Sequence, residues 1–146
     1  MIRKAILPAC LLCMGSLLIS CKKEKGDPKE TLASIMKADN SGNLVEVLSL
    51  YTNDARLMPA GRPDISGIDS IRENYRNIFA GSKLSLTGYA DETTQSNDLA
   101  MIRGRTEGIV FSLKDSSTIQ VHDKFIMILK YIEGKWKIHR LMWGMN

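Results

Sequence analysis

Residues 99–113 read LAMIRGRTEGIVFSL, and this stretch decides the fold. In its centre Ile102 and Gly104 alternate with Arg103 and Arg105. A period of two places successive side chains on opposite faces of a β-strand. The alternation therefore predicts one long strand with two chemically different faces.

Similar alternation appears on both sides of this stretch. The alternating segment is short at residues 83–87 and longer at residues 119–132 and 135–143. The intervening segments, residues 114–117 and 133–134, have the composition of tight turns. We therefore predict a run of long antiparallel strands in the second half of the chain.

The first half has the spacing of helices. Apolar side chains recur at intervals of three and four in residues 32–36, 44–51 and 71–79, which predicts three helices. Asn43 is a candidate N-cap for the second helix. Gly81 is expected to end the third.

The segment between the second and third helices is expected to be irregular. Residues 52–54 resemble a turn, residues 55–58 a short strand, and residues 59–67, rich in proline and glycine, a loop. Helices followed by antiparallel strands indicate an α+β fold. Long strands twist and curl, so we expect a cone-shaped fold of about three N-terminal helices packed on a curved, mainly antiparallel sheet, with a pocket at the mouth.

The amino end has the features of a bacterial lipoprotein signal peptide. Arg3 and Lys4 precede an apolar run over residues 5–19, and the sequence LISC at residues 18–21 resembles a lipobox. The run fits the roughly 7–15 apolar residues of a signal peptide and is shorter than the about 20 that a spanning helix needs. The resemblance implies cleavage before Cys21 and diacylation of its thiol. An uncleaved anchor and an ordinary secretory signal are the alternatives.

These features divide the chain into three parts. We expect a signal peptide at residues 1–20, a lipidated cysteine and charged tether at residues 21–30, and one domain at residues 31–146. Two acyl chains hold a protein stably at a membrane, so the expected location is the bacterial cell envelope. The absence of aspartate at position 22 favours the outer membrane, by resemblance to lipoprotein sorting.

Composition excludes several function classes. The formal net charge is +4, of which Arg3 and Lys4 supply two and residues 22–30 one, so residues 31–146 carry only +1. This distribution gives no support for nucleic-acid binding. His122 and His139 lack metal-site spacing, and no phosphate loop or dinucleotide motif is present, so we expect no metal and no cofactor.

Four short motifs occur in the order seen in one superfamily: LYTNDA at residues 50–55, PAG at 59–61, GIDSI at 67–71 and GKWKI at 134–138. Residues 30–146 thereby resemble the nuclear-transport-factor-2-like superfamily, closest to its SnoaL-like and ketosteroid-isomerase-like bacterial members. The resemblance implies a cone of three helices and a curved sheet, often dimeric through the sheet. It does not imply one activity, because this fold carries many functions.

The catalytic residues of ketosteroid isomerases mostly have no counterpart. The position of the proton-abstracting aspartate falls at Met58 or Pro59, and that of the tyrosine donor falls near Ile35. Only Asp123 matches, at the position of the second oxyanion carboxyl. We therefore expect no isomerase activity of that type.

Asp123 and His139 are the candidate catalytic residues. Asp123 lies in an apolar strand, so burial would raise its pKa and leave a neutral donor. Arg103 and Arg105 on the neighbouring strand could instead keep it ionised in a structural ion pair, or Asp123 could be an exposed carboxylate. His139 could exchange protons near neutral pH or have a structural role.

The leading hypothesis is a lipid-anchored protein that binds a small, largely apolar molecule inside the cone. The alternatives are a proton-transfer enzyme (isomerase, dehydratase or cyclase) that uses Asp123 with His139 or an arginine, and an interaction module. The interaction module would use the sheet face of Ile126, Ile128 and Ile132, and the expected partner is a second copy. The candidate pocket residues, which could instead belong to the core, are Tyr51, Met58, Tyr75, Arg103, Arg105, Phe125 and Trp143.

Overall fold

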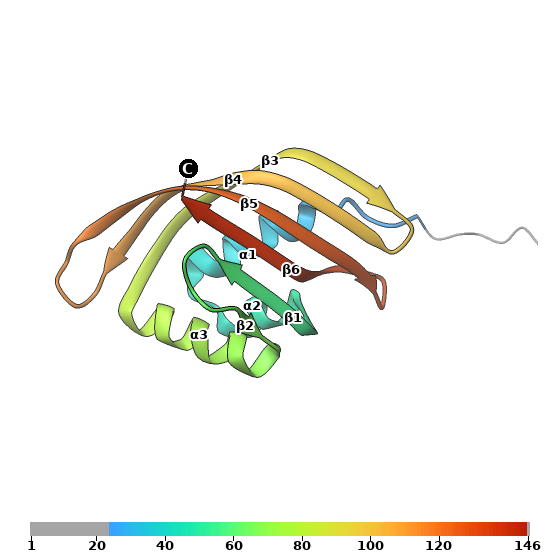
Figure 1. Cartoon of the computed structure of the whole chain (residues 1–146). Coiled ribbons are helices and arrows are strands. Elements are labelled where there is room, and N and C mark those ends of the chain that lie inside the picture. The colour runs from blue at the N-terminus through green and yellow to red at the C-terminus, as the bar shows by residue number, and fades with distance from the viewer. Residues whose placement is uncertain (1–23, 146) are drawn as a thin grey trace, which may run out of the picture.

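A computed structural model describes residues 24–145 of the protein (Figure 1). The predicted signal peptide and Cys21 lie outside the described residues. The helices are α1 (Lys29–Ser41), α2 (Leu44–Ser49) and α3 (Ile68–Gly81). The strands are β1 (Tyr51–Pro59), β2 (Ile65–Ser66), β3 (Ser82–Ser96), β4 (Leu99–Ser112), β5 (Thr118–Ile132) and β6 (Lys135–Met145).

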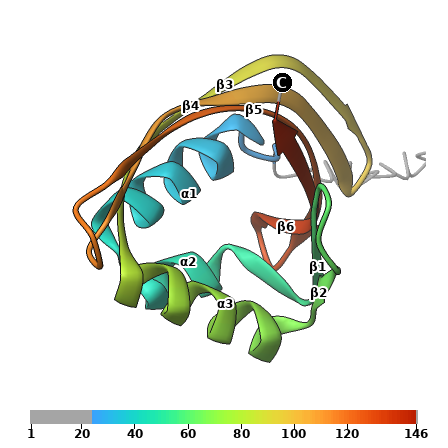
Figure 2. The same cartoon turned by 60° about the vertical axis from the view of Figure 1, so that its left-hand side comes forward.

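The strands form one sheet with the order β2-β1-β6-β5-β4-β3. Neighbouring strands are antiparallel except β1 and β6, which are parallel. Figure 2 shows the sheet curving around the helices, with α1 against its concave face and α2 and α3 on the far side of the enclosed core. The predicted α+β class and curved antiparallel sheet are therefore confirmed.

The helices occupy the three segments that the apolar spacing indicated. Asn43 caps α2, because its side-chain oxygen accepts a hydrogen bond of 3.1 Å from the Glu46 amide. After α1 the chain turns at Gly42, whose φ of 65° is left-handed and suits glycine. These local signals place α1 and α2 in succession along one edge of the core.

Alternation along the strands separates the buried face of the sheet from the outer face. On β5 the side chains of Phe125, Met127 and Leu129 are buried, whereas Ile126 between them is 40% exposed. The inner side chains join helix residues in one apolar core, whose largest fully buried members include Tyr51, Ile35, Leu57, Ile71, Ile102 and Ile138.

Two glycines on the inner face allow close packing. A Cβ atom at Gly88 would lie 3.0 Å from the Leu32 side chain and 3.1 Å from that of Met36, so α1 rests directly on β3 there. A Cβ atom at Gly104 would lie 2.0 Å from the Tyr89 carbonyl oxygen, closer than any real contact. Glycine is therefore required at position 104.

The predicted turn at residues 52–54 is wrong, because these residues belong to β1. Tyr51 pairs with Ile138 of β6, but the next pair joins Arg56 to Arg140, so β1 bulges out of register between the two pairs. The Thr52 hydroxyl donates to Asp54 Oδ1 at 2.8 Å inside the bulge. The polar residues thus mark a bulge, which uses the same local chemistry as a turn.

Part of the predicted tether packs on the domain. The helix α1 already begins at Lys29, and Lys25 Nζ contacts the Asn97 carbonyl at 2.5 Å and Asp98 Oδ1 at 2.6 Å. The Trp136 indole donates to the Gly26 carbonyl at 2.6 Å. The chain is therefore fixed at the end of the sheet where the β3–β4 and β5–β6 turns lie. In the described part of the chain, none of the helices has the length and apolar character needed to cross a bilayer.

Candidate functional site

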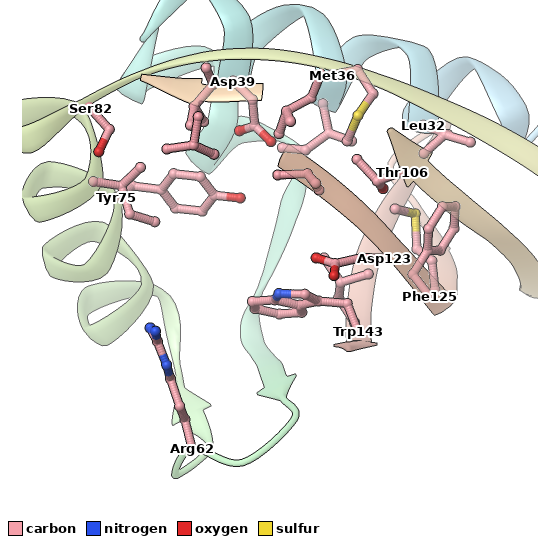
Figure 3. Close-up of a pocket in the computed structure, with 18 residues that line it drawn as sticks. Leu32, Met36, Asp39, Arg62, Tyr75, Ser82, Thr106, Asp123, Phe125 and Trp143 are labelled. Carbon is pink, nitrogen blue, oxygen red and sulfur yellow. The ribbon is translucent and has the colours of Figure 1, made fainter. Parts of the chain in front are cut away.

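A pocket of about 450 Å³ lies between the concave face of the sheet and the helices α1 and α3 (Figure 3). Its walls are mostly aliphatic and aromatic. Four side chains that line it can carry a charge or a phenolic proton. They are Asp39 of α1, Arg62 of the β1–β2 loop, Tyr75 of α3 and Asp123 of β5.

Asp39 reaches the pocket from the last turns of α1. It follows Leu32, Ile35 and Met36 on the same helix face, and all four line the pocket. The residue is only 8% exposed, and burial raises the pKa of its carboxyl to about 7, although the Tyr75 hydroxyl partly opposes this shift. Asp39 Oδ1 is buried and has no hydrogen-bond partner among the described residues.

Tyr75 stands beside Asp39 and is supported from behind by Tyr51. The two hydroxyl oxygens are 3.0 Å apart, and both side chains are buried. Burial is the main cause that raises the pKa of both phenols, with the nearby Asp39 adding to it. Both tyrosines therefore stay neutral, and Tyr75 presents its hydroxyl to the cavity (Figure 3).

Asp123 approaches from the opposite wall, close to the Trp143 indole (Figure 3). Burial raises the pKa of this carboxyl, in the direction that the sequence predicted. In the sheet Asp123 aligns with Thr106 of β4, which also lines the pocket. The two carboxyl groups thus face a common apolar space from different elements.

The arginines of β4, which were predicted to line the pocket, are not among its residues, and they do not form the ion pair with Asp123 that was one alternative. Arg103 and Arg105 point to the outer face of the sheet, because they alternate with the inward-facing Ile102 and Gly104. Arg103 Nε pairs with Glu92 at 3.0 Å. Arg105 pairs with Asp91 and Glu107.

His139 and Asp123 are not brought together. Asp123 aligns with Met145 of β6, six residues beyond His139 and therefore about 20 Å further along the strand. The His139 ring is buried against the β1 bulge, with Nδ1 3.2 Å from the Thr52 hydroxyl and 3.4 Å from Asp54. Burial, followed by the neighbouring Arg140 charge, lowers its pKa.

The remaining candidate residues divide between pocket, core and surface. Tyr75, Phe125 and Trp143 line the pocket, whereas Tyr51 lies behind Tyr75. Met58 is not among the pocket residues and aligns with the half-exposed Met142 on the outer face. Among the described residues, no cluster of histidine, cysteine and carboxylate side chains could hold a metal ion.

Sequence reasoning missed Asp39 and Arg62. Asp39 lies three residues after Met36 and four after Ile35, on the apolar side of the first helix. A carboxylate at such a position is a usable signal. Arg62 gave no such signal, because it lies in an irregular loop.

Comparison with known proteins supports the fold. No family model and no curated protein sequence matches this chain. A ketosteroid isomerase-like protein from Erwinia carotovora atroseptica is similar in structure, with a TM-score of 0.76, 24% sequence identity, and coverage of 84% of this chain and 96% of that chain. An NTF-2 like protein of unknown function from Shewanella oneidensis has a TM-score of 0.64, 23% identity, and coverage of 80% of this chain and 94% of that chain. A conserved protein from Planctomyces limnophilus has a TM-score of 0.73 at 13% identity, over 78% of this chain and 89% of that chain. The protein therefore has the nuclear-transport-factor-2-like fold.

Proposed function

We propose that this protein is a lipid-anchored protein of the bacterial envelope whose domain binds a small, largely apolar molecule. The single observation that carries the proposal is the pocket of about 450 Å³ beneath the curved sheet. Its volume lies within the range of about 300–1,000 Å³ that is usual for small-molecule sites. Mostly apolar walls with a few polar groups are also typical of such sites.

A thermal-shift and native-mass screen of the full-length protein tests the binding. The compounds are envelope lipids, sterols and aromatic metabolites. Leu84 lines the pocket, and the neighbouring Ser85 is exposed on the other face of β3. We expect Leu84→Trp to fill the cavity and abolish binding, and Ser85→Trp to leave it unchanged. Binding that survives Leu84→Trp, in a variant that still unfolds cooperatively, would place the ligand elsewhere.

The anchoring has a separate test. Cys13 lies inside the proposed signal peptide, so Cys13→Ser is a matched control for Cys21→Ser. We expect membrane fractionation and intact mass to show a diacylated chain that begins at Cys21 in wild type and Cys13→Ser, but not in Cys21→Ser. A free Cys21 thiol on a chain that keeps residues 1–20 would reject this part of the proposal.

A proton-transfer enzyme is the second candidate, and the pKa of Asp39 favours it. A carboxyl that titrates near pH 7 is suited to act as acid or base under physiological conditions. The test is deuterium uptake from heavy water into the carbon skeleton of a ligand recovered in the screen. Enzyme activity predicts uptake that Asp39→Asn removes. A ligand that binds but takes up no deuterium would indicate a binding protein without this activity.

We also propose that two copies pair through the outer face of the sheet, as the superfamily resemblance implies. Ile126 and Met142 are neighbours there, 40% and 49% exposed, and Met58 continues the row on β1. Ile128 lies on the same face, aligned with Met101 of β4. Met58, Met142 and Ile126 thus form an apolar row across β1, β6 and β5, and Ile128 and Met101 form a second apolar pair across β5 and β4. Such an apolar patch suits a second copy of the same sheet.

A further inference from the structure

We infer that the pocket takes an apolar molecule carrying one protonated amine, and that the Asp39 carboxyl receives this amine. The inference rests on the proposed ligand-binding function and specifies its chemistry. It starts from the Asp39 carboxyl, which lines the cavity and whose Oδ1 is buried with no hydrogen-bond partner among the described residues. A buried carboxylate that lacks hydrogen-bond donors is costly, and a ligand that donates a hydrogen bond to the carboxyl from the cavity relieves the cost.

The charged groups around Asp39 favour a cation. From α3 it faces the neutral Tyr75 hydroxyl, which Tyr51 of β1 supports from behind. From β5 it faces Asp123 across the cavity. Within the described lining, β3, β4 and β6 contribute no ionisable side chain, and Arg62 is the basic one.

Arg62 does not neutralise this interior. It is exposed and belongs to the β1–β2 loop at the rim, and Figure 3 shows it separated from Asp39 and Asp123. Two carboxyl groups on opposing walls repel an anionic ligand. They bind a cation through charge-assisted hydrogen bonds, which are stronger than neutral ones.

Ionisation of Asp39 then becomes part of binding. An aliphatic amine stays protonated up to a pH of about 10, whereas Asp39 loses its proton near pH 7. Affinity for an amine should therefore rise as the pH increases through this value. Affinity for a carbonyl compound should fall, because a carbonyl needs the protonated carboxyl as donor.

Three probes with one apolar cage separate these cases: 1-aminoadamantane, 1-adamantanol and adamantane-1-carboxylate. Calorimetric titration would use the full-length protein in lipid nanodiscs between pH 5.5 and 8.5, with empty nanodiscs as the blank. We expect the amine to bind at least about tenfold more tightly than the alcohol at pH 8, and the carboxylate most weakly. The affinity for the amine should increase with pH, while that for the alcohol should change little.

Asp39→Asn should weaken amine binding by about tenfold or more and remove most of its pH dependence. Glu73→Gln, which removes an exposed charge from α3, is the matched control and should bind like wild type. Thermal unfolding shows whether each variant folds. If Asp39→Asn does not fold, the pH dependence of amine affinity in the wild-type protein tests the inference.

Equal binding of the amine and the alcohol, amine affinity that falls with pH, or a folded Asp39→Asn variant with unchanged affinity would overturn the inference. These results would leave the proposed binding function intact, because the cage still binds. If no probe and no screened compound binds, the proposed function fails as well.

Discussion

The buried carboxyl of Asp39 makes the stability of the protein depend on pH. Its carboxyl pKa is about 7 in the folded protein, against 3.8 in a model peptide. Between these values the folded state holds a proton that the unfolded state has lost. The stabilising contribution is therefore complete below pH 3.8 and disappears as the pH rises to about 7.

Asp39→Asn should therefore stabilise the protein at neutral and alkaline pH. The free energy of unfolding of the variant should exceed that of wild type by up to about 4 kcal/mol at pH 8, and the difference should shrink toward pH 4. Urea unfolding at a series of pH values measures this difference. A constant difference across the series would show that burial does not perturb Asp39.

Asp115→Asn is the control with the opposite sign. Hydrogen bonds from Ser117 are the main cause that lowers the pKa of the exposed Asp115 carboxyl to about 2. Its stabilising contribution is present above the unfolded value of 3.8 and is lost as the pH falls through about 2. This variant should therefore be less stable than wild type at neutral pH, and the deficit should vanish in acid.

At the scale of elements, local pattern was sufficient where one face of a strand or helix is buried. Alternation around Ile102 and Gly104 located β4, and apolar spacing located the helices. The same pattern misassigned residues 52–54, because a bulge and a turn share polar, flexible residues. Arg103 and Arg105 were predicted to line the pocket because the alternation along β4 shows two faces but does not show which of them points inward.

The close contact between β4 and β3 gives a prediction for one strand. Gly104→Ala should reduce the free energy of unfolding by about 3 kcal/mol or more, because its methyl group would overlap the Tyr89 carbonyl. Gly81→Ala should change it by less than about 1 kcal/mol, since no atom lies within 4 Å of a Cβ there. Denaturant unfolding of both variants provides the comparison. If the two variants lost a similar free energy of unfolding, β3 and β4 would be able to move apart at position 104 without a measurable cost.

At the scale of the whole molecule, the pairing of distant segments could not be predicted. The parallel contact of β1 with β6 and the approach of α3 to α1 join segments far apart in the sequence. Asp39 and Tyr75 meet only through this packing. The length of the strands and the resemblance to a superfamily both predicted the cone, but the arrangement of polar groups inside it required the structure.

The proposed pairing of two copies through the outer face of the sheet gives a prediction at this scale. Ile126→Glu should convert a dimer into a monomer, because the charge would be buried between two sheets. Val45, which is 80% exposed on α2, provides the control substitution Val45→Glu. Light scattering of the full-length protein measures the mass. A wild-type monomer, or a dimer that persists in Ile126→Glu, would contradict pairing through this face.

Under the proposed lipidation, the contacts of Lys25 and Gly26 would set the orientation of the molecule at a bilayer. Lys25 is four positions after Cys21, so that end of the sheet would stay within about 14 Å of the lipidated cysteine. Arg62 and Trp143 lie at the opposite end of β6, about 25 Å from its turn with β5. The entrance would then open toward the aqueous compartment, and the cargo would arrive by diffusion through water instead of extraction from the lipid.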